Sequence, residues 1–176
     1  MMRRHALGLL LVAVVVHLLA VWAAPRLIMR VVGNKMAVMT SASDTGALHA
    51  PQVTAQSRAI VMPSPDMLYS TCTFDVSKGP LHITANPQLS TYWSIALYAA
   101  NSDNFFVVND RQAQGKPVDL KIVSSSSALA GQPDTVVAPT DTGVVLMRVL
   151  TGNYEAEKAV LEPARRTLQC TPFKAN

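Results

Sequence analysis

Three polar side chains, two of them close in the sequence and one distant, are of types that could do chemistry together. Asp66 and Tyr69 flank a proline-containing turn that enters a predicted strand, and Arg148 lies within an otherwise apolar strand. Asp66 and Tyr69 either face one cleft or close the turn and cover the sheet edge, and turn chemistry favours the second reading. A buried arginine needs a carboxylate or carbonyls as partner. We predict an ion pair of Arg148 with Asp66 or Asp75; contact with an anionic ligand is the alternative.

Other residues with chemical potential show no spacing that defines a reaction. The four histidines lack the spacing of zinc ligands, and no serine or glycine motif for nucleophilic attack or phosphate binding is present. Asp103–Asn104 and residues 109–111 bracket a short apolar run, and their oxygens suit either a Ca²⁺ site or ordinary turns. No glycine-spaced ligand series accompanies them, so turns are favoured. We predict neither a metal nor a cofactor.

An apolar run near the N-terminus predicts a membrane anchor. Residues 6–24 read ALGLLLVAVVVHLLAVWAA and carry no formal charge. A helix of this length nearly spans the hydrocarbon core of about 30 Å, and Trp22 lies where an indole prefers the interface. A cleaved signal peptide is the alternative, since Val21-Trp22-Ala23 offers a small-residue cleavage site. The length of the run, and its continuation past Pro25, favour a retained transmembrane helix.

Basic residues concentrate around this helix. The sequence has 15 Lys and Arg against 11 Asp and Glu, and residues 1–40 hold five of the basic residues and no acidic one. The remainder is close to neutral, whereas a nucleic-acid binder should carry a basic stripe on its folded domain. We therefore exclude nucleic acid as a partner. Arg26 and Arg30 suit a segment that lies in the headgroup layer of the lipid bilayer.

The chain divides into three predicted parts. Residues 1–39 form the transmembrane anchor and juxtamembrane segment, the small and polar residues 40–57 form a linker, and residues 58–176 form a β domain. Alternating apolar residues between turn clusters predict strands at 68–75, 81–84, 91–98, 105–108, 118–122 and 143–150. We expect a mainly β fold, an antiparallel β-sandwich or partly open barrel.

One amphipathic helix is predicted at the C-terminus. Within residues 154–168 the apolar stripe is formed by Val160, Leu161, Ala164 and Leu168. Pro163 lies inside this stretch and should kink or split the helix.

Several ordered motifs resemble one bacterial family. They are Pro65-x-Asp66-x-Leu68-Tyr69-Ser70, Asp75-Val76-Ser77-x-Gly79-Pro80, Tyr92-Trp93-Ser94, Asp103-Asn104-Phe105 and a strand from Pro139 through Gly143 to Arg148. Over about residues 58–150 the chain is similar to the family catalogued as domain of unknown function 1254, in its short, membrane-anchored form. The long form usually has Asn where this chain has Ser64-Pro65. The resemblance implies a β fold and a bacterial envelope location, and no known activity.

The function we expect is therefore that of an envelope protein without catalytic activity. It would span the inner membrane once through residues 6–24, with its C-terminal domain in the periplasm, and bind a partner or a ligand. The candidate ligand-binding residues are Asp66, Tyr69, Tyr92, Tyr98 and Arg148. The alternative is an envelope enzyme that uses Asp66, Tyr69 and Arg148.

The two cysteines predict a disulfide. An even number of cysteines in an exported chain favours pairing of Cys72 with Cys170. Cys72 lies on the same strand face as Leu68 and Phe74, and the residues before Pro172 are pushed out of helical conformation. Two independent buried thiols are the alternative.

The resemblance also suggests a partner. In long members of the family, this domain is fused to a second β domain, catalogued as domain of unknown function 1214. We expect the surface that the second domain would cover to be exposed in this chain. The predicted strand 91–98 offers a second face, formed by Tyr92, Ala96 and Tyr98. Aromatic residues of this kind are favoured at interface centres. We expect a separately encoded copy of the second domain to dock there, unless the C-terminal helix covers these tyrosines.

Overall fold

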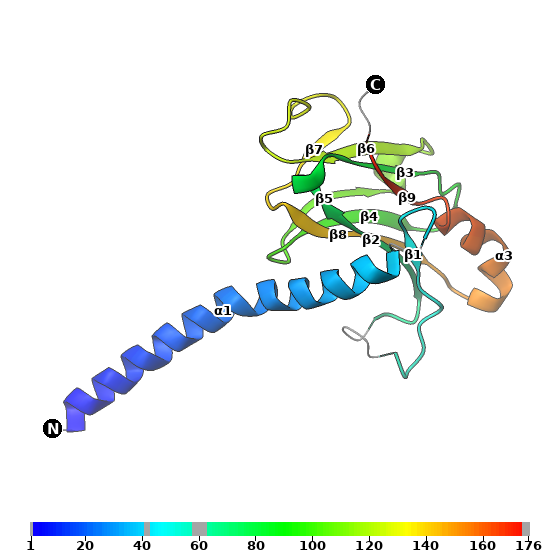
Figure 1. Ribbon diagram of the computed structural model, residues 1–176. Helices are drawn as coiled ribbons and strands as arrows, with labels where there is room; N and C mark the ends of the chain where they lie inside the picture. Colours follow the sequence, from blue (N-terminus) through cyan, green and yellow to red (C-terminus); the bar gives the residue numbers. More distant parts are fainter. Residues whose placement is uncertain (1, 41–42, 58–62, 174–176) are drawn as a thin grey trace.

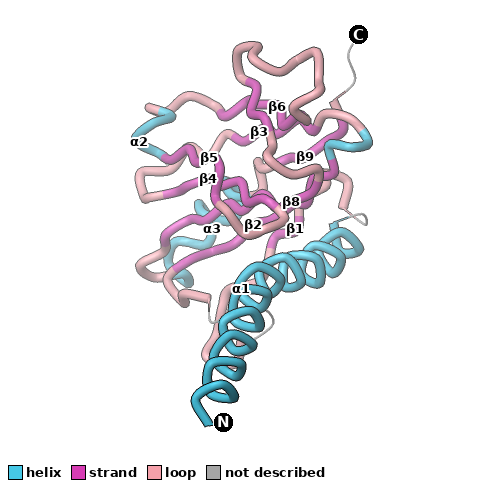
Figure 2. Tube along the Cα trace, turned by 90° about the vertical axis from the view of Figure 1, so that its left-hand side faces the viewer, coloured by secondary structure: helices cyan, strands magenta, loops and turns pink. Residues whose placement is uncertain are grey.

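The computed structural model describes residues 2–40, 43–57 and 63–173. A single long helix, α1 (Met2–Thr40), leads into a β-rich domain. Figure 1 shows the N-terminal half of α1 projecting away from the domain, and Figure 2 shows the same helix from the side. From His5 to Thr40 this helix is long and apolar enough to cross a membrane.

The second half of α1 rests on the β domain. Its partly buried residues recur every three or four positions, as at Arg26, Met29, Gly33 and Met36, and the helix ends at the buried Thr40. This spacing places them on one helical face. The segment after Pro25 continues α1 without a break and contacts β2, and its place in the headgroup layer stays a prediction.

Two sheets form the domain, and neither closes into a barrel. Sheet A has five strands, in the spatial order β1 (Leu48–His49), β2 (Met67–Asp75), β8 (Thr142–Leu150), β4 (Trp93–Ala99) and β5 (Asn104–Asn109). Sheet B has four strands, in the order β7 (Thr135–Val137), β6 (Val118–Val123), β3 (Leu81–Ala85) and β9 (Gln169–Pro172). All pairings are antiparallel except the parallel pair β6–β7. The mainly β prediction is confirmed.

The connections include three short helical elements. A 3₁₀ turn (Val76–Lys78) follows β2, α2 (Asp110–Ala113) follows β5, and α3 (Tyr154–Arg165) follows β8. Asn153 caps α3, since its side chain accepts a hydrogen bond from the backbone N–H of Ala156.

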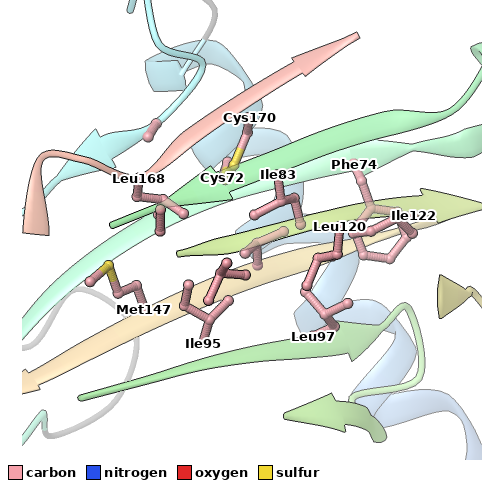
Figure 3. Close-up of a cluster of buried hydrophobic side chains, with 14 of the residues drawn as sticks. Cys72, Phe74, Ile83, Ile95, Leu97, Leu120, Ile122, Met147, Leu168 and Cys170 are labelled. Carbon is pink, nitrogen blue, oxygen red and sulfur yellow. A yellow bond between two sulfur atoms is a disulfide. The ribbon is translucent and has the colours of Figure 1, made fainter. Parts of the chain in front are cut away.

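The core lies between the two sheets. Figure 3 shows Ile95, Leu97 and Met147 of sheet A pointing toward Ile83 and Leu120 of sheet B. Successive strand residues point to opposite faces, so the alternation read from the sequence correctly separates core residues from outward ones. Among the predicted strands, 143–150 becomes β8, the central strand of sheet A.

A disulfide between Cys72 and Cys170 joins the two sheets, as predicted. Cys72 lies in β2 and Cys170 in β9, their Cα atoms are 6.5 Å apart, and the sequence separation is 98 residues. Pro172 lies at the end of β9, an edge strand of sheet B. Proline is tolerated there because an edge strand does not need every backbone N–H for pairing with a neighbouring strand. The alternative of two free thiols is wrong.

Residues 40–57, predicted to be a linker, are in part built into the domain. They contain β1, which pairs with β2, and the backbone N–H of Cys170 donates to the carbonyl of Thr45 (2.8 Å). Gly46 has a φ of 66°, and a Cβ at this position would collide with the carbonyl oxygen of Cys170. A glycine at position 46 is therefore required by the close packing beside β9.

The C-terminal helix differs from prediction in its buried face. Pro163 lies inside α3 without splitting it. Val160, predicted to be on the buried stripe, is 62% exposed, while Leu161 and Leu168 are buried as expected. The buried face includes Arg165, which is 1% exposed. The predicted apolar stripe did not include Arg165, since a charged residue is rarely buried without a partner.

We expect the disulfide to be a major source of domain stability. Replacing both Cys72 and Cys170 with Ser should lower the free energy of unfolding by about 2–5 kcal/mol, because a loop of this length restricts the unfolded chain strongly. Urea unfolding of the full chain, with and without reductant, measures this. Reductant should destabilise the wild type and leave the double variant unchanged; a wild type insensitive to reductant would contradict the prediction.

Candidate functional site

The outer face of sheet A, turned away from sheet B, brings three polar side chains into one row. In the strand register, Tyr69 of β2 is the partner of Arg148 of β8, and Arg148 is the partner of Ser94 of β4. Directly opposed residues have Cβ atoms about 4.5–5.5 Å apart, so the side chains of this row are neighbours. The row lies outside the part of the face that α1 covers, which is lined by Thr73 and Val144.

Among the described residues, Arg148 and Ser94 each have a buried side-chain atom without a hydrogen-bond partner, as do Asp110 and Arg165. The Nε atom of Arg148 and the Oγ atom of Ser94 are both buried, and neither has a hydrogen-bond partner. Ser94 is 0% exposed. Within the part of the chain that the structure describes, Arg148 forms no ion pair. Two adjacent, buried donors thus lack a hydrogen-bond acceptor, and one of them is charged. Such donors lower the stability of the folded state more than exposed donors, which can bond to water.

The predicted ion pair of Arg148 with Asp66 or Asp75 is wrong. Asp75 binds Lys78 (2.9 Å) and accepts a hydrogen bond from the backbone N–H of Ser77. It pairs with Thr142 in the strand register, six residues along β8 from Arg148, or about 20 Å at the rise of a strand. Asp66 is exposed and precedes β2, and its backbone carbonyl accepts from the N–H of Thr151 (2.9 Å).

Tyr69 closes the turn that we expected Asp66 to close. The backbone N–H of Ser64 donates to the Tyr69 hydroxyl oxygen (2.9 Å), and the N–H of Met67 donates to the Ser64 carbonyl (3.3 Å). Neither the cavity between α1 and sheet A nor the cavity beside α3 is lined by Asp66, Tyr69 or Arg148. The three residues of the enzyme alternative therefore share no cavity there, and Asp66 lies apart from the other two.

An apolar rim surrounds the row. Tyr92 is 37% exposed, Val107 is 42% exposed and Leu150 is 36% exposed, and all three lie on the outer face of sheet A. Tyr98 is half-buried on the same face, and Ala96 between the tyrosines is 1% exposed. The docking of a partner at this strand stays a prediction.

A second polar cluster, which the sequence analysis missed, ties α3 to sheet A. We call it the α3 corner: His49, Ser70, Tyr154, Glu162 and Arg165. Arg165 donates to Glu162 (2.7 Å) and to the backbone carbonyl of Tyr69 (2.9 Å), and His49 bonds Ser70 (2.9 Å). The Tyr154 hydroxyl donates to Glu162 (3.2 Å). The spacing Glu162-x-x-Arg165 could have predicted this ion pair from the sequence, because residues three apart on a helix lie close together.

The charges of the α3 corner are compensated. Burial lowers the pKa of His49, and the positive charges of Arg165 and Arg166 lower it further. Burial by itself raises the pKa of Glu162, but the hydrogen bond and charge of Arg165 outweigh this, so that pKa lies below its usual value. The corner therefore holds an ionised Glu162 and an uncharged imidazole at neutral pH. Ser70 is 1% exposed, so its hydroxyl positions His49 and is not accessible to a substrate.

The other candidate residues serve local structure. Asn109 caps α2 by accepting from the N–H of Gln112 (3.0 Å), and Asp103 accepts from the side chain of Asn101. In residues 2–40, 43–57 and 63–173 no three His, Cys, Asp or Glu side chains come together in a way that could hold a metal ion.

A family model matches most of the chain. The family is described as "Protein of unknown function (DUF1254)", and the match covers residues 46–172. The chain belongs to this family. Three of the sequence motifs that resemble this family contain Tyr69, Ser94 and Arg148, one residue each. The polar row therefore brings three separate motifs together.

One solved structure supports the fold and adds no activity. The VPA0106 protein from Vibrio parahaemolyticus is similar with a TM-score of 0.55 at 12% identity, over 62% of this chain and 28% of that chain. An uncharacterised protein from Burkholderia cenocepacia is similar with a TM-score of 0.48 at 16% identity, over 88% of this chain and 41% of that one. The chain thus spans less than half the length of each. No curated protein matches it.

Two adjacent arginines test whether the α3 corner anchors the helix. Arg165→Met should lower the free energy of unfolding by about 3–5 kcal/mol, because it leaves the partly buried Glu162 without its main partner. Arg166→Met is the matched control: Arg166 binds the same carboxylate but its side chain is 56% exposed, so the loss should stay below about 1 kcal/mol. Urea unfolding measures both. Equal losses of unfolding free energy in the two variants would show that burial of the Arg165–Glu162 pair does not add to its contribution to stability.

Proposed function

We propose that this protein is a membrane-anchored binding module of the bacterial envelope, which binds an anionic ligand on the outer face of sheet A. The observation that carries the proposal is the buried, unpartnered Nε of Arg148, which lies beside the unpartnered Oγ of Ser94. A folded protein satisfies nearly all of its buried polar groups, and the exceptions call for an explanation.

An oxyanion supplies the acceptor that the Arg148 guanidinium lacks. A carboxylate or phosphate oxygen accepts hydrogen bonds from a guanidinium and a hydroxyl together, and bonds to a charged donor are about twice as strong as neutral ones. Tyr69, next to Arg148 in the row, accepts from Ser64 through its hydroxyl oxygen and so retains its own proton for donation. The partly buried Arg148 and Tyr69 therefore present donors to a ligand from two strands, whereas the neighbouring Ser94 is 0% exposed and is enclosed by the protein.

The rim defines the rest of the ligand. Tyr92, Val107 and Leu150 are exposed beside the row, and binding sites commonly combine apolar walls with a few placed polar groups. An amphiphile with an anionic head and an apolar body fits this combination. Three features support a binding role without catalysis: Asp66 stands apart, Arg148 is uncompensated, and the acid of the α3 corner is already paired.

Two features support the envelope location. The apolar part of α1 is long enough to cross a bilayer, and it continues without interruption into the part that packs on the domain. Cys72 and Cys170 form a disulfide, a bond that persists in oxidising compartments. We propose that residues 6–24 are retained as a single inner-membrane span, with the domain in the periplasm.

Reporter fusions test the topology. A fusion after Asp66 should be active with a periplasmic reporter and silent with a cytoplasmic one, because the domain would lie across the membrane from the N-terminal arginines. The reverse pattern contradicts the location. N-terminal sequencing of the mature protein supplies the second measurement: a start near Ala24 would establish cleavage in place of an anchor.

Replacing Arg148 tests the binding site. Arg148→Met should leave the free energy of unfolding unchanged or raise it, because it removes an unpaired, partly buried charge and breaks no pair. In full-length protein, octanoate should raise the melting temperature relative to chloride at equal ionic strength, since a ligand of the folded state stabilises it. Arg148→Met should abolish this rise.

Arg111→Met is the control, since it removes the same charge from an exposed position on α2. It should keep the octanoate response. If Arg148→Met destabilises as strongly as Arg165→Met, or keeps the octanoate response, the anion site is wrong.

A further inference from the structure

A groove separates α1 from the outer face of sheet A. It has a volume of about 860 Å³. From α1 its walls include Trp22, Arg26, Arg30, Gly33 and Ala37, which follow one another at intervals of three or four residues. The helix therefore presents one continuous face to the groove. Figures 1 and 2 both show this half of α1 running beside the sheet.

The opposite wall comes from the end of sheet A that lies away from Arg148. It includes Thr73 and Asp75 of β2, Lys78 of the 3₁₀ turn, Asn101 after β4, and Val144 of β8. The groove is thus distinct from the row formed by Tyr69, Arg148 and Ser94. It reaches from the apolar part of α1 to the body of the domain.

One end of the groove meets the proposed membrane surface. Trp22 ends the apolar run, where an indole prefers the interface between hydrocarbon and headgroups. From Trp22 to Ala37 the helix rises about 22 Å, which carries the groove from the headgroup layer to the domain. A molecule of the outer leaflet can therefore enter the groove along α1 without leaving the membrane.

The charges lining the groove are mainly positive. Among its described walls, Arg26, Arg30 and Lys78 are basic and Asp75 is acidic. Arg26 stacks on the ring of Trp22 at 4.5 Å and donates to the Trp22 carbonyl (2.6 Å), so its position is fixed at the interface level. Lys78 binds Asp75 (2.9 Å). Apolar residues, including Leu27, Met29 and Val144, complete the walls.

We propose that this groove holds one anionic phospholipid of the membrane that α1 spans. The phosphate lies near Arg30 and Lys78, and the acyl chains follow Leu27 and Trp22 toward the bilayer. This inference rests on the proposed membrane anchoring and not on the Arg148 site. The positive walls select an anionic lipid, since each basic residue near a membrane attracts such lipids.

The test uses full-length protein in nanodiscs of phosphatidylcholine with a minor fraction of phosphatidylglycerol. Native mass spectrometry of the released protein should show one retained phosphatidylglycerol, enriched over phosphatidylcholine. Arg30→Gln should reduce this enrichment about fivefold, the effect of one cation at a membrane surface. Lys35→Gln is the matched control, because Lys35 is exposed on the same helix outside the groove. It should retain the lipid.

A second pair of variants separates filling of the groove from charge. A Cβ at Gly33 meets nothing within 4 Å, and Gly33 lines the groove, so Gly33→Leu places an apolar side chain in the groove. It should displace the lipid. Gly8→Leu is the control, since Gly8 is equally open but lies in the apolar run, away from the groove.

Each outcome decides the inference. Equal loss of lipid in Arg30→Gln and Lys35→Gln would show attraction by surface charge alone, and equal retention of both lipids would show no selection; either overturns the proposal while anchoring stands. Failure of the protein to incorporate into nanodiscs would instead overturn the anchoring itself, and the lipid site with it.

Discussion

Sheet A is enclosed on both of its faces near its centre, and most of the structure follows from this constraint. In β8, Val145 faces sheet B and is fully buried, while Val144 on the opposite face is 7% exposed beside α1. A strand covered on both sides cannot alternate between apolar and polar residues in the usual way. A polar group placed in such a strand, as Arg148 is, either finds a partner or stays unsatisfied. Two of the buried unpartnered polar atoms of the described residues, Arg148 Nε and Ser94 Oγ, therefore lie side by side in this sheet.

The same enclosure fixes the helix on the domain. Thr40 at the end of α1 is buried, and the segment that follows is bonded to β9 through Thr45 and packed on it at Gly46. A flexible tether would let the domain rotate relative to α1. This junction instead sets the angle between helix and sheet, so the groove beside α1 keeps its two walls together. The disulfide adds to this, since Cys170 touches both the junction and the core.

Sequence patterns predicted the parts of this fold that depend on local periodicity. The long strands were found because alternation over six to nine residues is visible in one dimension, and the core face of 91–98 was assigned correctly. Strands β1, β7 and β9 have two to four residues, too few to show a period, and exist through their neighbours.

The candidate site depended on information that periodicity does not contain. The pairing of Arg148 with Asp66 or Asp75 failed because sequence does not give strand register, and register places Asp75 at the far end of β8. The row of Tyr69, Arg148 and Ser94 becomes visible only once three strands are aligned. Arg165 was missed because hydrophobicity assigned the buried face of α3, whereas a charge satisfied by Glu162 and a carbonyl can be buried too.

The bond between Cys72 and Cys170 also orders the events by which the chain is made. During synthesis, Cys72 emerges 98 residues before its partner, which belongs to the last strand to be added to sheet B. Until then Cys72 has no thiol of its own chain to react with, because the sequence contains two cysteines in all. Oxidation in that interval would couple Cys72 to a foreign thiol. The Cys72 thiol in β2 must therefore be shielded or stay reduced until β9 has been synthesised. Formation of the disulfide then marks the completion of the domain.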